Sequence, residues 1–326
     1  MTICRTPYRV SFFGGGTDHP SWFLQHGGAV LSMTVNKYCY ISIRYLPSVF
    51  GIRHRIVWSH IETVESISEI LHPAVRAGLI SEGFDDIEGV ELHHQGDLPA
   101  RSGIGSSSAF SVGLINVLRA MRGKTTPAEE LARAAIDLEQ SKLRENGGCQ
   151  DQVASAFGGL NVIRFERNGS FTVTPAALNN TSCREFEHRL MLFYTNGGRL
   201  SSNFSKMFVE SLDANTSQLK RMQAMVPEAL ALLHSGDFDA FGHLLHESWT
   251  LKRHLTRGIS TPAIDQAYQA ARRAGAIGGK LLERISVGRN RLGFPIGRES
   301  DSSCLLVLEA SMDGTTVFER SARASG

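Results

Sequence analysis

Long apolar runs are missing from this sequence: no stretch approaches the roughly 18 residues that a membrane-spanning helix requires. A dominant charge is missing too, because 34 Lys and Arg residues stand against 32 Asp and Glu residues, for a formal net charge of +2. The first residues, 1–5, are not followed by the apolar segment of a secretory signal. These absences predict a cytoplasmic protein with neither a nucleic-acid partner nor a membrane partner.

Cysteine is too sparse for a disulfide framework: the chain has five scattered cysteines, an odd number, which indicates reduced thiols in a cytoplasm. The length of 326 residues predicts about two domains, each large enough to bury its own core. Glycine, by contrast, is plentiful at 32 residues, many of them clustered beside Ser, Thr or Asp. Such clusters indicate loops that approach a ligand closely.

The first half of the chain alternates β-type and helical segments. Alternating β-branched and aromatic residues predict strands at 38–43, 89–93 and 160–165. Apolar residues at helical spacing predict helices at 108–122 and 127–143, the second with Thr126 as N-cap and Pro127 in the first helical position. Strands, then helices, then strands predict an α+β domain rather than a strict βαβ repeat.

A polar, turn-rich segment at 168–182 predicts a domain boundary, with one domain at 1–175 and another at 176–326. Beyond it, the apolar run at 189–194 predicts a buried strand. Helices are expected at 203–234, 237–255 and 261–274, the last opened by Pro262.

The most informative cluster lies at 97–110, between a predicted strand and a predicted helix. Its glycines allow close backbone turns, its serines are suited to cap the helix, and the first amides of the helix attract an anion, usually phosphate. A Ser hydroxyl in such a loop also reaches Mg²⁺ held on phosphates. The lysine of the P-loop and the dinucleotide glycine spacing are both absent. A serine-rich N-cap turn is the alternative interpretation.

Two further clusters carry charged residues. A Gly-Gly-Gly turn at 14–16 delivers Thr17 and Asp18 at a strand end, which suits sugar hydroxyls, and Arg9 upstream suits a phosphoryl group. An ordinary glycine turn explains this segment equally well. Asp151, after Gly147-Gly148 and before a small-residue helix, is either a general base or a helix cap.

Together, the order and spacing of these clusters resemble the GHMP kinases, the superfamily of galactokinase, homoserine kinase, mevalonate kinase and phosphomevalonate kinase. The resemblance extends from Thr6 through the Gly-Ile-Gly-Ser-Ser-Ser core at 103–108 and the segment 150–161 to Lys280. It implies an α+β, two-domain fold: an N-terminal domain like ribosomal protein S5 domain 2, a ferredoxin-like C-terminal domain, and the site in the cleft between them.

Within this family, Phe-Phe-Gly-Gly-Gly-Thr-Asp at 12–18 and Gly-Cys-Gln-Asp-Gln at 148–152 look like the D-glycero-D-manno-heptose 7-phosphate kinases. The resemblance implies phosphoryl transfer from ATP, with Mg²⁺, to the anomeric hydroxyl of that sugar phosphate or a related sugar. Two alternatives stay open. One is a GHMP kinase for another sugar or small alcohol, and the other is a catalytically impaired ligand-binding paralogue.

The resemblance also assigns roles to residues. Asp151 is the expected catalytic base and Arg9 its basic partner. Glu139 and Ser107 are the expected Mg²⁺ ligands. ATP phosphates are expected on Pro99, Gly103, Ile104, Gly105, Ser106, Ser107 and Ser108, and sugar hydroxyls on Gly16, Thr17 and Asp18. Candidates for a second substrate phosphate are Arg101, Lys142, Arg144, Arg199 and Lys252.

The pattern breaks late in the chain. Residues 274–282 begin like motif 3 of the family, which continues into a glycine-dense loop and an apolar strand, but arginine and serine follow Leu282 here. Either the reading frame of the gene changes beyond Leu282, or the tail diverges and the run at 304–308 still forms a strand. Translating the other two frames past this point decides between these explanations.

Overall fold

The computed structural model describes residues 1–99, 103–193, 211–255, 259–282 and 316–319. Its framework is a mixed sheet built on two long antiparallel strands, β1 (Thr2–Phe13) and β2 (Gly28–Tyr45), which are joined by α1 (Pro20–His26). The remaining strands are β3 (His54–Val57), β4 (Ile61–Val64), β5 (Val90–Gly96), β6 (Leu160–Phe165), β7 (Phe171–Pro175) and β8 (Thr316–Glu319). The order β4-β3-β5-β2-β1-β8 makes one path, in which β3 and β5 run parallel.

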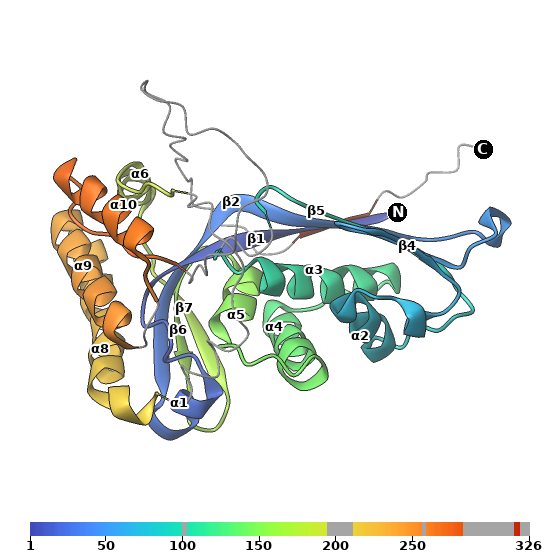
Figure 1. The fold of residues 1–326 in the computed structure, drawn as a ribbon, viewed down its shortest axis with the longest axis horizontal. Coiled ribbons are helices and arrows are strands. Elements are labelled where there is room, and N and C mark those ends of the chain that lie inside the picture. The colour runs from blue at the N-terminus through green and yellow to red at the C-terminus, as the bar shows by residue number, and fades with distance from the viewer. Residues whose placement is uncertain (100–102, 194–210, 256–258, 283–315, 320–326) are drawn as a thin grey trace.

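Strand β2 is long enough to pair with two different strands on one edge. Its first half, 28–33, pairs with β6, and its second half, 39–45, pairs with β5. The first half is buried at every position because α5 and α8 both pack on it, on opposite sides of the sheet (Figure 1). The second half alternates between more and less buried residues, as expected of a sheet with one covered face.

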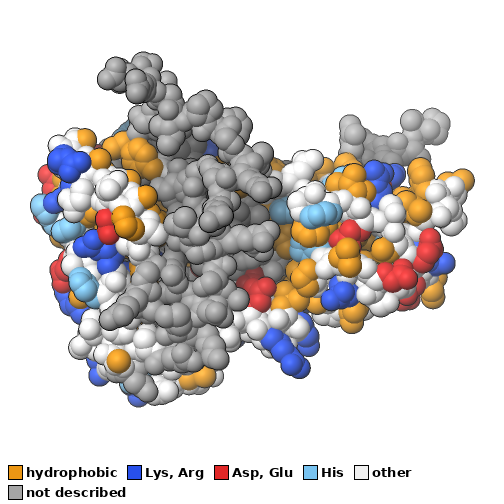
Figure 2. Space-filling model, in the orientation of Figure 1, with side chains coloured by type: hydrophobic (Ala, Val, Ile, Leu, Met, Phe, Trp, Pro, Cys, Tyr) orange, Lys and Arg blue, Asp and Glu red, His pale blue; other side chains and the backbone are white. Residues whose placement is uncertain are grey.

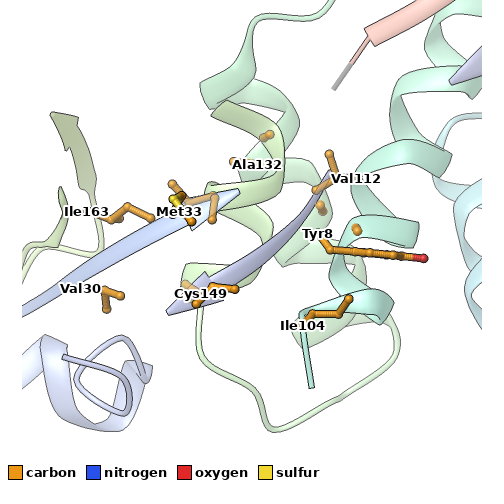
Figure 3. Packing of buried hydrophobic residues seen from close by; sticks show 14 of the residues in the cluster. Tyr8, Val30, Met33, Ile104, Val112, Ala132, Cys149 and Ile163 are labelled. Atoms are coloured by element: carbon orange, nitrogen blue, oxygen red, sulfur yellow. The ribbon is translucent and has the colours of Figure 1, made fainter. Parts of the chain in front are cut away.

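One face of the sheet is covered by the helices of the first half of the chain (Figure 1). These are α2 (Pro73–Ser81), α3 (Ser106–Met121), α4 (Ala128–Ile136) and α5 (Gln150–Phe157), with a π-helical turn at Asp137–Lys142 continuing α4. Short 3₁₀ turns lie at Ser48–Phe50, Ile67–Glu69 and Asp213–Asn215. Ile104 and Cys149, which precede α3 and α5, belong to the same buried cluster as Met33 and Val112 (Figure 3). Apolar packing therefore anchors the N-termini of both helices.

The second half of the chain contributes α6 (Asn180–His188), α8 (Thr216–Ser235), α9 (Phe238–Leu255) and α10 (Pro262–Arg273). Helices α8 and α9 pack against each other, and α8 also packs against β1 and β2. Leu219, Met222 and Val226 are buried along α8. This packing brings the end of α9 and the segment after α10 to the sheet that carries β1.

Most of the predicted elements are confirmed. The helix expected at 127–143 is helical to Lys142, but Pro127 rather than Thr126 is its N-cap. The strand predicted at 189–194 is wrong for its described part, 189–193, because α6 ends at His188 and only Leu192 forms a β-bridge. Residue 194, the first part of the helix expected at 203–234, and the run at 304–308 lie outside the described residues.

The polar segment at 168–182 contains one more strand, β7. It pairs with β6 and extends the sheet to Pro175. A boundary after residue 175 stays our proposal. The ferredoxin-like C-terminal domain stays a prediction, because 194–210 and 283–315 lie outside the described residues. Among the described helices, none is long and apolar enough to cross a membrane.

Candidate active site

A large cavity of about 1460 Å³ lies between the two halves of the chain; we call it the main cavity. Its walls come from β1 and the turn after it, the loop before α3, the segment 143–152 and the ends of α9 and the 280–282 segment. The face in Figure 2 shows positive and negative side chains interspersed, without a large patch of one sign.

The most tightly organised pair in the cavity is Arg9 with Asp151. The Arg9 guanidinium donates from Nε to Asp151 Oδ1 at 2.6 Å and from Nη2 to Asp151 Oδ2, and Nη1 donates to the Gly103 carbonyl at 3.0 Å. Arg9 is buried on β1, whereas the Asp151 side chain, in the first turn of α5, keeps 23% of its surface exposed. A bidentate pair of this kind fixes the orientation of the carboxylate.

The loop before α3 packs directly on this pair. Gly105 has φ of +72°, and a Cβ there would lie 3.3 Å from Asp151 Oδ2, so this position requires glycine. The Ile104 carbonyl accepts from the Arg9 backbone N–H at 3.0 Å. Gly105 is also the N-cap of α3 and makes no side-chain capping bond. The expectation that the serines cap the helix is therefore wrong: they occupy the first helical turn, and the N-cap itself carries no side chain.

The predicted ATP-phosphate residues are brought together along this loop. Ser106, Ser107 and Ser108 open α3, and all three line the cavity together with Gly105 and Pro99. Gly103 and Ile104 are buried behind them. Residues 100–102 lie outside the described residues, and with them the candidate Arg101.

Glu139 lies deep in the cavity wall on the π-helical turn. Its Oε2 accepts from Ser108 Oγ at 3.1 Å and from Gln152 Nε2 at 2.6 Å, whereas Oε1 is buried with no hydrogen-bond partner. Burial raises the pKa of Glu139 to about 7, against the opposing effect of the Ser111 and Ser108 hydroxyls. A buried carboxylate with one open oxygen beside the glycine loop fits a hard cation such as Mg²⁺.

The two expected Mg²⁺ ligands are placed differently. Glu139 contacts Ser108, while Ser107 is exposed at the helix N-terminus and also lines the cavity. Across the described part of the chain, no group of three or more His, Cys, Asp or Glu side chains is arranged to hold a metal ion. A cation here would depend on substrate phosphates and water for its remaining ligands.

Asp18 joins the glycine turn to α5. Its Oδ1 accepts from the Gly16 N–H at 2.8 Å and its Oδ2 from the Gln150 N–H at 3.2 Å. A Cβ on Gly148 would collide with this carboxylate. Burial, with the nearby Asp151 charge adding to it, raises the pKa of Asp18. We call Arg9, Asp18, Glu139 and Asp151 the reaction end of the cavity.

Thr17 is the one predicted sugar-binding residue that does not reach the cavity. Its side chain is 0% exposed, and its hydroxyl lies 2.7 Å from the Gly14 carbonyl and accepts from the Ala29 N–H at 3.1 Å. Thr17 therefore stabilises the packing of the glycine turn against β2. Gly16 and Asp18 line the cavity as expected.

Another part of the cavity wall is formed by aromatic and imidazole rings that the sequence did not single out. Phe110 lies 4.9 Å from His72 and 4.8 Å from His94, and Trp58 lies 4.8 Å from His72, all between ring centroids. Burial lowers the pKa of His72, and burial with His72 beside it lowers that of His94 to about 4. We call these four residues the ring end, and its imidazoles are uncharged at neutral pH.

Two lysines enter the cavity from the second half of the chain. Lys280 donates to the Phe12 carbonyl at 3.0 Å, and Lys252 donates to the Leu281 carbonyl at 3.0 Å. Burial, with Lys252 and Arg9 nearby, lowers the pKa of Lys280 well below its ordinary value. Among the other second-phosphate candidates, Arg144 lines the cavity and Lys142 pairs with Asp137 at the surface. Arg199 lies outside the described residues.

Comparisons with known proteins point to one family. The profile described as GHMP kinases N terminal domain matches residues 67–159, and the one described as GHMP kinases C terminal matches residues 229–282. A D-glycero-alpha-D-manno-heptose 7-phosphate kinase from Campylobacter jejuni is 26% identical over 286 residues, covering 85% of this chain and 84% of the relative. A bifunctional fucokinase/GDP-fucose pyrophosphorylase from Arabidopsis thaliana is 26% identical, covering 82% of this chain and 27% of the relative.

Solved structures share the architecture. The crystal structure of a D-glycero-D-manno-heptose 1-phosphate kinase from Bacteriodes thetaiotaomicron matches with a TM-score of 0.74 at 21% identity, covering 98% of this chain and 99% of that chain. The galactokinase of Lactococcus lactis complexed with galactose matches with a TM-score of 0.59 at 18% identity, covering 86% and 83%. These likenesses confirm the expected two-domain α+β fold.

Proposed function

We propose that this chain, which two GHMP kinase profiles match, is a GHMP kinase and an ATP-dependent kinase for a sugar phosphate. The reaction transfers the γ-phosphoryl group of ATP to the anomeric hydroxyl of D-glycero-D-manno-heptose 7-phosphate or a related sugar. The relative from Campylobacter jejuni supports this acceptor. Partners are the two small molecules, and a cytoplasmic location is part of the proposal.

One observation carries the proposal: a carboxylate held by a bidentate arginine directly beside a glycine loop at a helix N-terminus. The exposed edge of Asp151 accepts the proton of the attacking anomeric hydroxyl. Arg9 keeps that carboxylate oriented and places positive charge where the phosphoryl group passes. Because phosphoryl transfer depends mainly on positioning and electrostatics, this fixed geometry does most of the work.

ATP spans the cavity in this proposal. Its phosphates lie on the first turn of α3, at Gly105, Ser106 and Ser107, where backbone amides and the helix dipole favour negative charge. Glu139 and Ser107 would hold Mg²⁺, which neutralises phosphate charge when bound. The adenine lies at the ring end, where uncharged rings offer an apolar stacking surface.

The acceptor's own phosphate requires cations away from the nucleotide loop. Arg9 is already committed to Asp151 and Gly103. Lys252 supplies positive charge on the side of the cavity formed by the second half of the chain, and Arg144 also lines the cavity. Lys280, whose pKa burial lowers, takes up a proton when the phosphate binds beside it. This placement supports a phosphorylated acceptor over a neutral sugar.

A coupled ADP-release assay against a panel of sugars, sugar 7-phosphates and small alcohols tests the proposal, with Asp151→Asn as the control. We expect turnover with a heptose 7-phosphate that exceeds turnover with the unphosphorylated heptose. Turnover with another alcohol alone would instead support the alternative of a GHMP kinase for another sugar or small alcohol. If no acceptor gives ADP release above that of Asp151→Asn, the kinase proposal fails. The alternative of a catalytically impaired ligand-binding paralogue then replaces it.

A further inference from the structure

Gly15 is a glycine that neither the backbone nor the packing requires. Its neighbours Gly14 and Gly16 have φ of +79° and +101°, which favour glycine, whereas Gly15 has no such conformation. A Cβ on Gly15 would meet only Ser11 Oγ at 3.5 Å and Gln150 Nε2 at 3.6 Å, which are ordinary contacts. An alanine would therefore fit the fold, and what the glycine preserves is a gap in the cavity wall.

The two side chains that border this gap carry unused polar atoms. Ser11 Oγ is buried without a hydrogen-bond partner, and so is Gln150 Oε1. Both residues line the main cavity together with Gly15. Buried polar groups in folded proteins normally have partners, so two such atoms flanking one gap indicate that a ligand supplies the missing bonds.

The gap lies within the reaction end. Ser11 stands two residues after Arg9 on β1, where alternate side chains share a face, and both side chains face the cavity. Gln150 directly precedes Asp151, and its backbone N–H holds Asp18. A group in the gap would thus lie between the proposed base and the Asp18 carboxylate.

We infer that Ser11, Gln150 and the bare backbone of Gly15 form a subsite for one hydroxyl of the acceptor sugar and determine acceptor specificity. This inference rests on the proposed kinase function. A sugar hydroxyl both donates and accepts a hydrogen bond, as a serine hydroxyl does. The Gln150 amide offers one acceptor and two donors, so the three groups satisfy one another. A side chain at position 15 would occupy the hydroxyl's place.

The test compares Ser11→Ala with Ser155→Ala, a matched control. Ser155 Oγ is also buried without a partner, but it lies on α5 outside the cavity wall. With D-glycero-D-manno-heptose 7-phosphate and its monodeoxy analogues as acceptors, the unaltered enzyme should discriminate against one analogue by about tenfold in kcat/KM. Ser11→Ala should lose that discrimination and raise the KM of the parent acceptor about tenfold, with the KM for ATP unchanged. Ser155→Ala should behave like the unaltered enzyme.

Gly15→Ala provides the second variant, because it fills the gap without removing a polar group. It should raise the KM of the parent acceptor and leave that of the matching deoxy analogue unchanged. If both variants keep the original KM and selectivity while the enzyme turns over, only water occupies the gap and the inference is overturned, although the kinase function stands.

A binding measurement separates this result from failure of the proposed function. If no acceptor is turned over, calorimetry with the same heptose 7-phosphate compares the unaltered protein with Gly15→Ala. About tenfold weaker binding to Gly15→Ala supports the subsite without catalysis. Equal binding to both proteins, or binding to neither, overturns it.

Discussion

The reaction end and the ring end of the main cavity are built in different ways. At the reaction end, charged side chains from distant segments hold one another: the bidentate pair of Arg9 and Asp151 joins residues 142 positions apart. At the ring end, Trp58, His72, His94 and Phe110 contact each other mainly through their rings. One end is fixed by directional charge-assisted bonds and the other by packing.

Under the proposed function, the two ends have different roles. Directional bonds place a carboxylate to within a narrow range of angles, which proton transfer requires. Packed, uncharged rings tolerate small shifts and suit the stacking of a planar base. Changes at the reaction end should therefore affect kcat, and changes at the ring end should affect the KM for ATP.

The largest effect is expected from Asp151→Asn. The amide has no proton-accepting carboxylate and breaks the bidentate pair with Arg9, so kcat should fall by about 10²- to 10⁴-fold. The KM for ATP should change little, because the ring end is untouched. Steady-state kinetics measures both, with Asp137→Asn, a surface carboxylate paired with Lys142, as the control. A larger change in the KM for ATP than in kcat would contradict the separate roles of the two ends.

The second largest effect is expected from Glu139→Gln, which should change the Mg²⁺ requirement. The Mg²⁺ concentration for half-maximal activity should rise by at least the roughly 10- to 100-fold that loss of a supporting group costs. Glu129→Gln, at an exposed carboxylate, is the control. An unchanged Mg²⁺ requirement would show that Glu139 does not bind the metal ion.

The same variant tests the raised pKa of Glu139. Folded protein binds this proton more tightly than unfolded protein, because the pKa is about 7 when folded against an ordinary 4.5. Without Mg²⁺, this group should therefore lower the free energy of unfolding as pH rises from 4.5 to 7, by on the order of 3 kcal/mol. Denaturant titrations across this range should show a flatter decline for Glu139→Gln. An identical decline in both proteins would contradict the assigned pKa.

Lys280→Met should weaken binding of the acceptor's phosphate and should not slow the reaction itself. The KM for heptose 7-phosphate should rise about 10- to 100-fold, because a charge-assisted hydrogen bond is lost. The KM for the unphosphorylated heptose should stay the same. Lys142→Met, which removes a surface lysine, serves as the control. Equal losses with both sugars would show that Lys280 acts on the transferred group instead.

The smallest effect is expected at the ring end from Phe110→Leu. Loss of the aromatic stack should raise the KM for ATP about three- to tenfold and leave kcat unchanged. Phe84→Leu replaces another buried phenylalanine, outside the cavity wall, and controls for general loss of stability. A fall in kcat without a change in the KM for ATP would erase the distinction between the two ends.

The sequence predicted the reaction end far better than the ring end. The roles of Arg9, Glu139 and Asp151 were expected from the resemblance to the GHMP kinases, and the structure brings all three into one cavity. Trp58, His72 and Phe110 come from three separate segments with no shared pattern, and only tertiary packing brings them together. A contact between distant segments leaves no local signal in a single sequence.

Neighbouring residues of one motif also differ in ways that only the structure reveals. Thr17 turns inward to hold Ala29, while Asp18 beside it lines the cavity. Ser108, rather than Ser107, meets Glu139. Such differences follow from side-chain direction on the turn and on the helix, which composition and spacing leave open.

Phosphorus NMR of the reaction product is the decisive test of phosphoryl transfer to the anomeric hydroxyl. The enzyme is incubated with ATP, Mg²⁺ and D-glycero-D-manno-heptose 7-phosphate, and the sugar product is isolated. The proposed function predicts two phosphorus signals, one of them coupled to the anomeric proton, and about 100-fold or more less of this product with Asp151→Asn over the same incubation. A product with a single phosphorus, or a second phosphorus coupled to any other proton, would contradict it.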